Sequence, residues 1–186
     1  MSSRLIVPPV ELAVSMEAAR LAARVDIAED GTSSLDAEIE QAIRTYTTEA
    51  EGETGRALID QTWRLTLDTF PAAIALRNPP LLQVAHLKFY DAAGVQQTLD
   101  PQDIQVDPES EPGYVVPAPG KAWPGAARRI NAIEVQYRAG YGPDHTSVPD
   151  GIKGFILARV QEHFETNGQP KNEYVKRLLW PYKVYL

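Results

Sequence analysis

The chain has 186 residues, 44% of them apolar and 23% charged, a composition typical of one globular domain or of one domain with a large insertion. It contains no cysteine, which excludes disulfide bonds, cysteine-based zinc or iron–sulfur sites and a thiol nucleophile. The net charge of -7 argues against binding of nucleic acid through a basic surface. The sequence has no long apolar run and no signal-peptide pattern at its N-terminus, so we expect no membrane association.

Two helices are predicted within residues 1–60. The first covers residues 15–25, which lack proline and glycine, with Ser15 as the N-cap and Glu17 in the first turn. The second starts at a cap provided by Ser33 or Ser34 and stops at Gly55. Its apolar stripe consists of Leu35, Ile39, Ala42, Ile43, Tyr46 and Ala50.

The second predicted helix is strongly acidic. Six carboxylates against one arginine give residues 36–53 a charge of -5. A solvated helix face explains such a run, and the alternative is a surface that meets a basic partner or repels DNA. The six carboxylates are Asp36, Glu38, Glu40, Glu49, Glu51 and Glu53.

A β-rich segment is predicted for residues 61–142, where the apolar period changes to two. Trp63, Leu65 and Leu67 would share one side of a strand, and residues 91–94 form a turn signal between two antiparallel strands. Frequent prolines keep the strands short, and we expect a small β-sandwich or barrel. The predicted strands cover residues 62–68, 74–76, 84–90, 95–99, 104–106, 113–116 and 130–137.

Helices return after Pro149. The apolar stripe from Ile152 to Phe164 predicts a helix that ends at Gly168, and a last short helix is expected over residues 172–180, stopped by Pro181. Residues 171–186 carry a charge of +3. The predicted fold class is therefore α+β, a small helical bundle with an inserted short-stranded β-sandwich or barrel-like segment. Its parts are residues 1–60, the β insertion 61–142, and residues 143–186, which complete the bundle.

No pattern in the chain indicates a catalytic, metal or cofactor site. Glu162 and His163, with Glu165 nearby, lack the spacing of a zinc-binding helix, and Asp144-His145 has the composition of a polar loop. We therefore interpret these groups as solvated surface and expect no bound metal.

Other short motifs are equally weak. Neither a Gly-x-Ser-x-Gly elbow nor a phosphate-binding loop occurs, and Gly140-Tyr141-Gly142 reads as a strand that ends in a tight turn. Arg128-Arg129 near Trp123 could contact nucleic acid, but two arginines in a proline-rich loop indicate this only weakly.

The C-terminal segment is unusual because large apolar side chains gather near the end of the sequence given. They either pack on the core of the same chain or bind another subunit or protein, where aromatic residues beside bases are frequent anchors. The candidate partner-binding residues are Tyr174, Leu178, Leu179, Trp180, Tyr182 and Tyr185.

Four stretches, in order, together resemble the head–tail connector (adaptor) proteins of long-tailed phages and related prophage or gene-transfer elements. They are the acidic helix running into Glu53-Thr54-Gly55-Arg56-Ala57-Leu58-Ile59-Asp60-Gln61-Thr62-Trp63, Arg77-Asn78-Pro79-Pro80-Leu81 with the strand ending Phe89-Tyr90-Asp91, Tyr137-Arg138-Ala139-Gly140-Tyr141-Gly142 with Val148-Pro149, and Leu178-Leu179-Trp180-Pro181-Tyr182-Lys183-Val184. The resemblance covers residues 35–184, and residues 1–14 have no counterpart in it.

The resemblance implies a structural virion protein that is not an enzyme and needs no cofactor. Such proteins form a homo-oligomeric ring, commonly of twelve copies, under the portal, and the ring extends the DNA channel and docks the next head-completion or tail protein. DNA would pass through the lumen without specific binding. The C-terminal helix and tail contact the portal in this family, which points to residues 172–186 of this chain.

The sequence is also compatible with other functions. The first alternative is a different head-completion or tail-completion (stopper) protein of the same virion. Further alternatives are a cellular adaptor or scaffold module, and a hydrolase with a site in the β segment.

The charge distribution is compatible with a ring. In a ring, one face of a subunit meets a different face of the next, and an acidic helix and a basic tail on one chain are suitable complementary surfaces.

Overall fold

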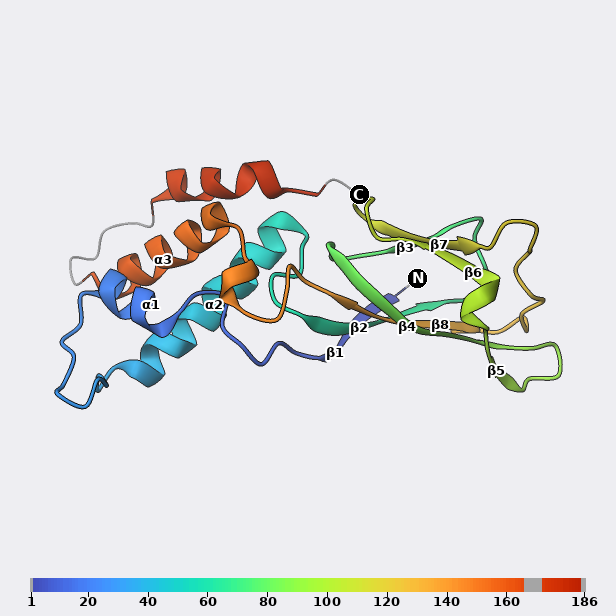
Figure 1. Ribbon diagram of the computed structural model, residues 1–186, viewed down its shortest axis with the longest axis horizontal. Coiled ribbons are helices and arrows are strands. Elements are labelled where there is room, and N and C mark those ends of the chain that lie inside the picture. The colour runs from blue at the N-terminus through green and yellow to red at the C-terminus, as the bar shows by residue number, and fades with distance from the viewer. Residues whose placement is uncertain (1, 166–171, 185–186) are drawn as a thin grey trace. The chain divides into compact units, whose positions relative to one another are not determined.

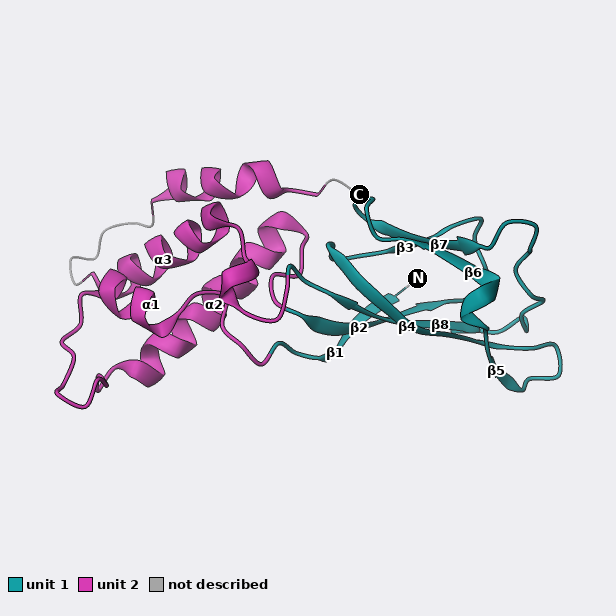
Figure 2. Ribbon diagram, in the orientation of Figure 1, with its two compact units in different colours: residues 1–9, 60–141, 186 teal, residues 10–59, 142–185 magenta. Residues whose placement is uncertain are grey.

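The computed structural model describes residues 2–165 and 172–184, and the chain divides into two compact units (Figures 1 and 2). Of the described residues, 2–9 and 60–141 form the sheet unit, and 10–59, 142–165 and 172–184 form the helical unit. The chain therefore enters and leaves each unit more than once, because a β-rich segment is inserted between helical segments.

The sheet unit consists of two antiparallel sheets, which lie face to face in Figure 1. The first has the order β1-β2-β8-β4-β5, and the second has the order β3-β7-β6. The α+β fold class is confirmed, in the form of two open sheets and not a closed barrel. The strands of the first sheet are Ser2–Val7, Gln61–Leu67, Ile133–Ala139, Leu81–Tyr90 and Gln96–Thr98, and those of the second are Ile74–Leu76, Gly113–Pro117 and Ile104–Asp107, the last preceded by the 3-10 turn η1 (Pro101–Asp103).

Alternation along the central strands explains why the sheets pack. In the pairing of β2 with β8, Leu65 lies opposite Val135 and Leu67 lies opposite Ile133, and all four side chains are buried. The Tyr137 hydroxyl is also buried and donates a 3.0 Å hydrogen bond to the backbone carbonyl of Arg77. One face of β2 and of β8 is thus core, and the opposite face carries mostly polar residues.

Several strand limits differ from the prediction. Strand β1 was not predicted, because its residues have no regular alternation and it pairs only through the sheet edge, with a register shift after Leu5. Strand β4 starts at Leu81 and not at residue 84, and β8 starts at Ile133 and not at residue 130. The hairpin of β4 and β5 is antiparallel, as expected.

The helical unit starts with α1 (Met16–Ala23) and α2 (Asp36–Thr54). The Ser15 hydroxyl accepts a hydrogen bond from the backbone N–H of Ala18, which confirms the predicted cap of α1. The predicted serine cap of α2 is wrong, since Leu35 occupies the N-cap and its side chain caps nothing. Gly55 ends α2 in the left-handed conformation with φ 71°, as its lack of a Cβ favours.

The unit is completed by the 3-10 turn η2 (His145–Ser147), by α3 (Asp150–Phe164) and by η3, a 3-10 helix over Glu173–Tyr182. Helix α3 ends at Phe164, before the predicted stop at Gly168, which lies outside the described residues. Pro181 was predicted to stop the last helix but lies inside η3. Within the described ranges, no helix combines the length and the hydropathy needed to cross a bilayer.

Candidate functional site

The candidate site is the last 3-10 helix, η3, which is fixed to the helical unit by its inner side. Leu179 is fully buried, and the ring of Tyr182 lies against Gly151 at the start of α3. A methyl group on Gly151 would stand only 2.8 Å from Cε2 of Tyr182, so the close approach depends on the absence of a side chain there.

Three kinds of polar contact hold η3 and the residues after it. The Nε of Arg56 donates a 2.6 Å hydrogen bond to the carbonyl oxygen of Tyr182, and the N–H of Val184 donates a 2.8 Å bond to the carbonyl of Thr54. The Glu53 carboxylate accepts hydrogen bonds from the ammonium groups of Lys176 and Lys183, at 3.2 and 3.1 Å. The carboxyl end of α2 is therefore the docking place of the tail.

The charges at this end of α2 reinforce one another. Hydrogen bonds from Lys183 and Lys176 hold the pKa of Glu53 below its usual value. The same contact with Glu53 raises the pKa of Lys176. Both shifts favour the charged forms, so Glu53 and Lys176 stay ionised across the neutral range.

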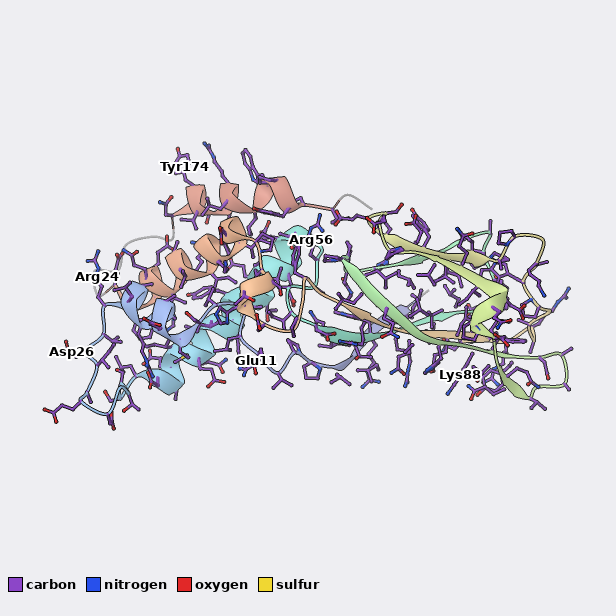
Figure 3. The ribbon with its side chains drawn as sticks, in the orientation of Figure 1. Glu11, Arg24, Asp26, Arg56, Lys88 and Tyr174 are labelled. Carbon is purple, nitrogen blue, oxygen red and sulfur yellow. The ribbon has the colours of Figure 1, made fainter. Side chains whose placement is uncertain are left out.

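The outer side of η3 presents an aromatic surface. Tyr174 and Trp180 are 68% and 59% exposed, and Leu178 is also exposed. The guanidinium carbon of Arg177 lies 4.4 Å from the ring centroid of Tyr174 and 5.4 Å from that of Trp180. We call Tyr174, Arg177, Leu178 and Trp180 the aromatic face; Figure 3 labels Tyr174 on it.

The structure thus divides the predicted partner-binding residues into two sets. Leu179 and Tyr182 pack on the helices of their own unit, whereas Tyr174 and Trp180 are exposed. Leu178 is partly exposed, and its Cδ1 lies close to α3, 3.8 Å from the position that a Cβ on Gly154 would take. Tyr185 lies outside the described residues. The two alternatives for the tail are therefore not exclusive, because one side of η3 docks internally while the other remains accessible.

The predicted acidic residues lie on α2, and the structure distributes them among separate partners. Asp36 is bound by Arg20 at 2.6 Å, Glu40 by Arg44 at 2.8 Å, and Glu53 by the two lysines of the tail. Glu51 accepts a 2.9 Å hydrogen bond from the N–H of Leu58. These four carboxylates are thus largely compensated within the chain.

The other two predicted acidic residues approach α3. Glu38 lies 3.4 Å from Nε2 of His163, and Glu49 lies 3.8 Å from a guanidinium nitrogen of Arg159. Of the six, only Glu38 and Glu40 are exposed. An acidic surface formed by α2 is therefore narrower than the sequence indicates.

Arg159 is a buried charge that the sequence analysis did not identify. Its side chain has no exposed surface and pairs with Glu162 at 2.6 Å. The other oxygen of Glu162 accepts a 3.0 Å hydrogen bond from the N–H of Asn172, the N-cap of η3. The sequence did hold one indication of this burial. Arg159 stands four residues after Phe155 and next to Val160, at helical spacing with the apolar stripe of α3 that faces the core.

The remaining polar motifs have structural partners. Asp144 caps η2 through the N–H of Thr146, and Trp123 stacks on Phe70 at 4.7 Å instead of presenting its ring to a ligand. No group of three or more histidine, aspartate or glutamate side chains within residues 2–165 and 172–184 could hold a metal ion.

No family model matches the sequence, and no curated protein matches it either. The fold is similar to that of chains in solved structures of gene transfer agent (GTA) particles. These are the neck of an empty GTA particle with C6 symmetry (TM-score 0.83, 18% identity) and the virion of a native GTA particle (TM-score 0.80, 19% identity). A third is the neck of a native GTA particle with C12 symmetry (TM-score 0.74, 21% identity). Each comparison covers 100% of this chain and 97% of the other, so the chain has, over its whole length, a fold that occurs in the necks of GTA particles.

Proposed function

We propose that the chain is a structural subunit of the neck of a phage-like particle, and more narrowly a head–tail connector (adaptor). The observation that carries the proposal is the similarity to chains of GTA particles, which covers 100% of this chain and extends through both units. The four sequence stretches that resemble connector proteins support the same role.

The proposed assembly is a ring of identical subunits, commonly twelve, at the head–tail interface of the virion. The similar chains belong to necks with C6 and C12 symmetry, which fits a closed ring of repeated copies. The ring would continue the DNA channel, with DNA passing through the lumen without sequence-specific contact. The proposal assigns the chain no catalytic reaction, no cofactor and no membrane partner.

The aromatic face is the proposed portal-binding surface. Tyrosine, tryptophan and arginine are the residues most enriched at the energetic centres of protein interfaces, and three of the four members of this face belong to those types. Its inner side is fixed by Leu179 and Arg56, so the face is presented by a docked segment and little ordering is lost on binding. Glu38 and Glu40 on α2 remain candidates for a surface toward the channel or a neighbouring subunit.

The experiment is electron microscopy of the purified chain mixed with the portal protein of the same genome. The proposal expects rings with a central hole seated on the portal. A chain cut after Lys171 should lose portal binding, whereas an Arg44→Met variant, altered on the exposed side of α2, should retain it. A strict monomer in the presence of the portal would contradict the connector role, and portal binding by the truncated chain would contradict the tail assignment.

A stopper or tail-completion protein is the second candidate, because similarity to chains of a neck does not distinguish this role from that of a connector. The two roles differ in the order of assembly. A connector binds the bare portal, whereas a stopper binds only after a connector ring is present. A pull-down with portal alone and with portal carrying its ring separates them.

A further inference from the structure

The polar face of the five-stranded sheet is basic although the chain is acidic. Arg4 of β1 lies opposite Arg64 of β2. Arg64 lies in turn opposite Gln136 of β8, and Gln136 lies opposite His86 of β4, so these side chains form one row across the sheet. Lys88 lies on this side too, and Figure 3 shows it pointing away from β6 and β7. We call Arg4, Arg64, Lys88, Arg129 and Arg138 the basic sheet face.

A polar hollow of about 260 Å³ lies within this face, lined by Arg64, Lys88 and Arg129 among others. The Arg129 guanidinium stacks 4.0 Å above the ring of Tyr90, which holds it at the rim. Glu134 is the carboxylate of the hollow and lies 3.3 Å from Arg64 and from His86. Three cations and one carboxylate therefore line the hollow, and of the three cations Arg64 is the one that pairs with Glu134. The hollow has room for a further carboxylate from outside.

A second carboxylate, Asp60, also pairs with one of these bases. Asp60 accepts hydrogen bonds from the guanidinium of Arg138, at 3.0 Å from its Nε. Arg4 and Arg129 are exposed. The five bases against Glu134 and Asp60 leave an excess of positive charge.

The opposite charge gathers on the other sheet of the same unit. Residues 100–111 contain five acids and no base, and they form η1, the edge strand β6 and the turn before β7. Lys121 pairs with Asp103 at 3.2 Å, and Asp100 and Glu109 are exposed. We call Asp100, Asp103, Asp107, Glu109 and Glu111 the acidic edge.

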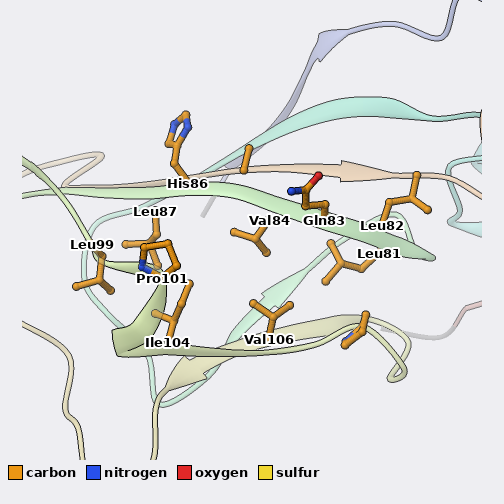
Figure 4. Close-up of a pocket in the computed structure, with 12 residues that line it drawn as sticks. Leu81, Leu82, Gln83, Val84, His86, Leu87, Leu99, Pro101, Ile104 and Val106 are labelled. Carbon is orange, nitrogen blue, oxygen red and sulfur yellow. The ribbon is translucent and has the colours of Figure 1, made fainter.

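The basic sheet face and the acidic edge cannot meet within one sheet unit. The apolar side chains of the two sheets face one another, as Figure 4 shows for Leu87 and Val84 of β4 and for Ile104 and Val106 of β6, while His86 points to the other side of β4. The basic sheet face is turned outward from this core, and the acidic edge belongs to the sheet across it. Complementary surfaces on different sides of one unit suit a head-to-tail contact between copies.

We infer that the basic sheet face binds the acidic edge of the next copy of this chain, with a carboxylate of that edge entering the hollow between Arg64, Lys88 and Arg129. The inference rests on the proposed ring and specifies which surfaces close it. A second copy fits better than DNA, because a net charge of -7 repels a polyanion and the chain itself supplies the matching carboxylates. Screening by salt weakens such a contact, since the Debye length falls from about 10 Å at 0.1 M to about 3 Å at 1 M.

The test uses two reciprocal charge reversals in the full chain. Arg4→Glu, Lys88→Glu and Arg129→Glu together change the charge of the basic sheet face, counted with Glu134 and Asp60, from +3 to -3. Asp103→Lys, Glu109→Lys and Glu111→Lys together change the charge of the acidic edge from -5 to +1. Arg24→Glu is the control for the variant of the basic sheet face, because it adds negative charge at an exposed position of the helical unit. Assembly is followed by native mass spectrometry and negative-stain microscopy, alone and with portal, after circular dichroism has confirmed folding. Arg4→Gln with Arg129→Gln is a milder replacement where a reversal does not fold.

Each reversal alone should raise the concentration needed for assembly by roughly tenfold or more, because like charges then face one another. A 1:1 mixture of the two reversed chains should assemble again, since an alternating ring restores opposite charges at every contact. The control should assemble as the unmodified chain does.

The inference would be overturned if either reversed chain formed rings at the same protein concentration as the unmodified chain. It would also be overturned if the 1:1 mixture of the two reversed chains did not assemble. Loss of binding to a 30-base-pair duplex with unchanged assembly would also overturn it, in favour of a nucleic-acid surface. In both cases, unmodified rings that bind the portal leave the proposed function standing. If the unmodified chain neither assembles nor binds the portal, that result contradicts both the proposed function and the inference.

Discussion

The Nε of Arg56 donates a 2.6 Å hydrogen bond to the backbone carbonyl of Tyr182, 126 residues further along the chain. Arg56 follows directly after the glycine that ends α2, and its side chain is only 9% exposed. Figure 3 labels Arg56 at this end of α2. The contact fixes the end of η3, so the aromatic face depends on a residue that does not belong to it.

Replacing Arg56 by methionine should therefore loosen η3. The change leaves the Tyr182 carbonyl without its charged donor, and the expected loss of unfolding free energy is about 1.5–3 kcal/mol. Urea denaturation measures the loss, and hydrogen exchange should rise in residues 173–184. Arg44→Met is the matched control, because its exposed pair with Glu40 contributes about 0.5 kcal/mol or less. Equal effects of the two changes would show that Arg56 has no special role.

Gly151 and Gly154 offer a paired test of the docking of η3. Alanine at Gly151 would collide with the Tyr182 ring at 2.8 Å, whereas alanine at Gly154 meets Leu178 at an ordinary 3.8 Å. Gly151→Ala should lower the melting temperature and weaken portal binding. Gly154→Ala should stabilise α3 by roughly 0.5–1 kcal/mol, since alanine has the higher helix propensity. Equal melting temperatures for the two variants would count against the packing of Tyr182 on α3.

The Glu53 cluster predicts a pH dependence of stability. The pKa of Glu53 is lowered in the folded chain from its ordinary value of 4.5, so its contribution is present above that value and is lost as the pH falls through the folded pKa. Unfolding free energy of the unmodified chain should therefore decline below about pH 4.5 more steeply than that of Glu53→Gln. The same measurement on Glu40→Gln is the control, and parallel curves for Glu53→Gln and the unmodified chain would refute the role of the cluster.

The two sides of η3 should separate stability from binding. Trp180→Ala and Tyr174→Ala remove exposed rings, so unfolding should change by about 0.5 kcal/mol or less while portal binding weakens markedly. Leu179→Ala removes a fully buried side chain and should cost about 2–5 kcal/mol. Surface plasmon resonance with immobilised portal and urea denaturation measure the two effects. Full portal affinity in the Trp180→Ala, Tyr174→Ala double variant would contradict the assignment of the aromatic face.

Much of the fold could be predicted because its signals are local. Ser15 caps α1 through its own hydroxyl, Gly55 ends α2 with a positive φ, and the alternation of Leu65 and Leu67 gives the buried face of β2. These features depend on one residue and its immediate neighbours. The prediction of two helical segments flanking a β-rich segment rests on the same kind of signal.

The missed features depend on contacts between distant residues. Strand β1 exists because it pairs with β2, more than 50 residues away, and its own sequence shows little alternation. Pro181 lies inside η3, where contacts of Leu179 and Tyr182 with the helical unit outweigh its usual effect. Propensity alone does not include such tertiary contributions.

The acidic helix illustrates the same limit for the candidate site. A charge of -5 along residues 36–53 suggests one broad anionic surface. In the folded unit, Arg20 compensates Asp36, and Lys176 and Lys183 compensate Glu53. These bases lie far from the carboxylates in sequence, so their pairing follows only from the packing of α1 and η3 on α2.

Electron microscopy of the chain mixed with the portal protein of its own genome tests the central claim most directly. The connector role predicts a closed ring of identical subunits, with a central hole, seated on the portal, and loss of that binding when the aromatic residues Tyr174 and Trp180 are replaced by alanine. A chain that remains monomeric beside the portal, or that joins the particle only through another neck protein, would contradict it.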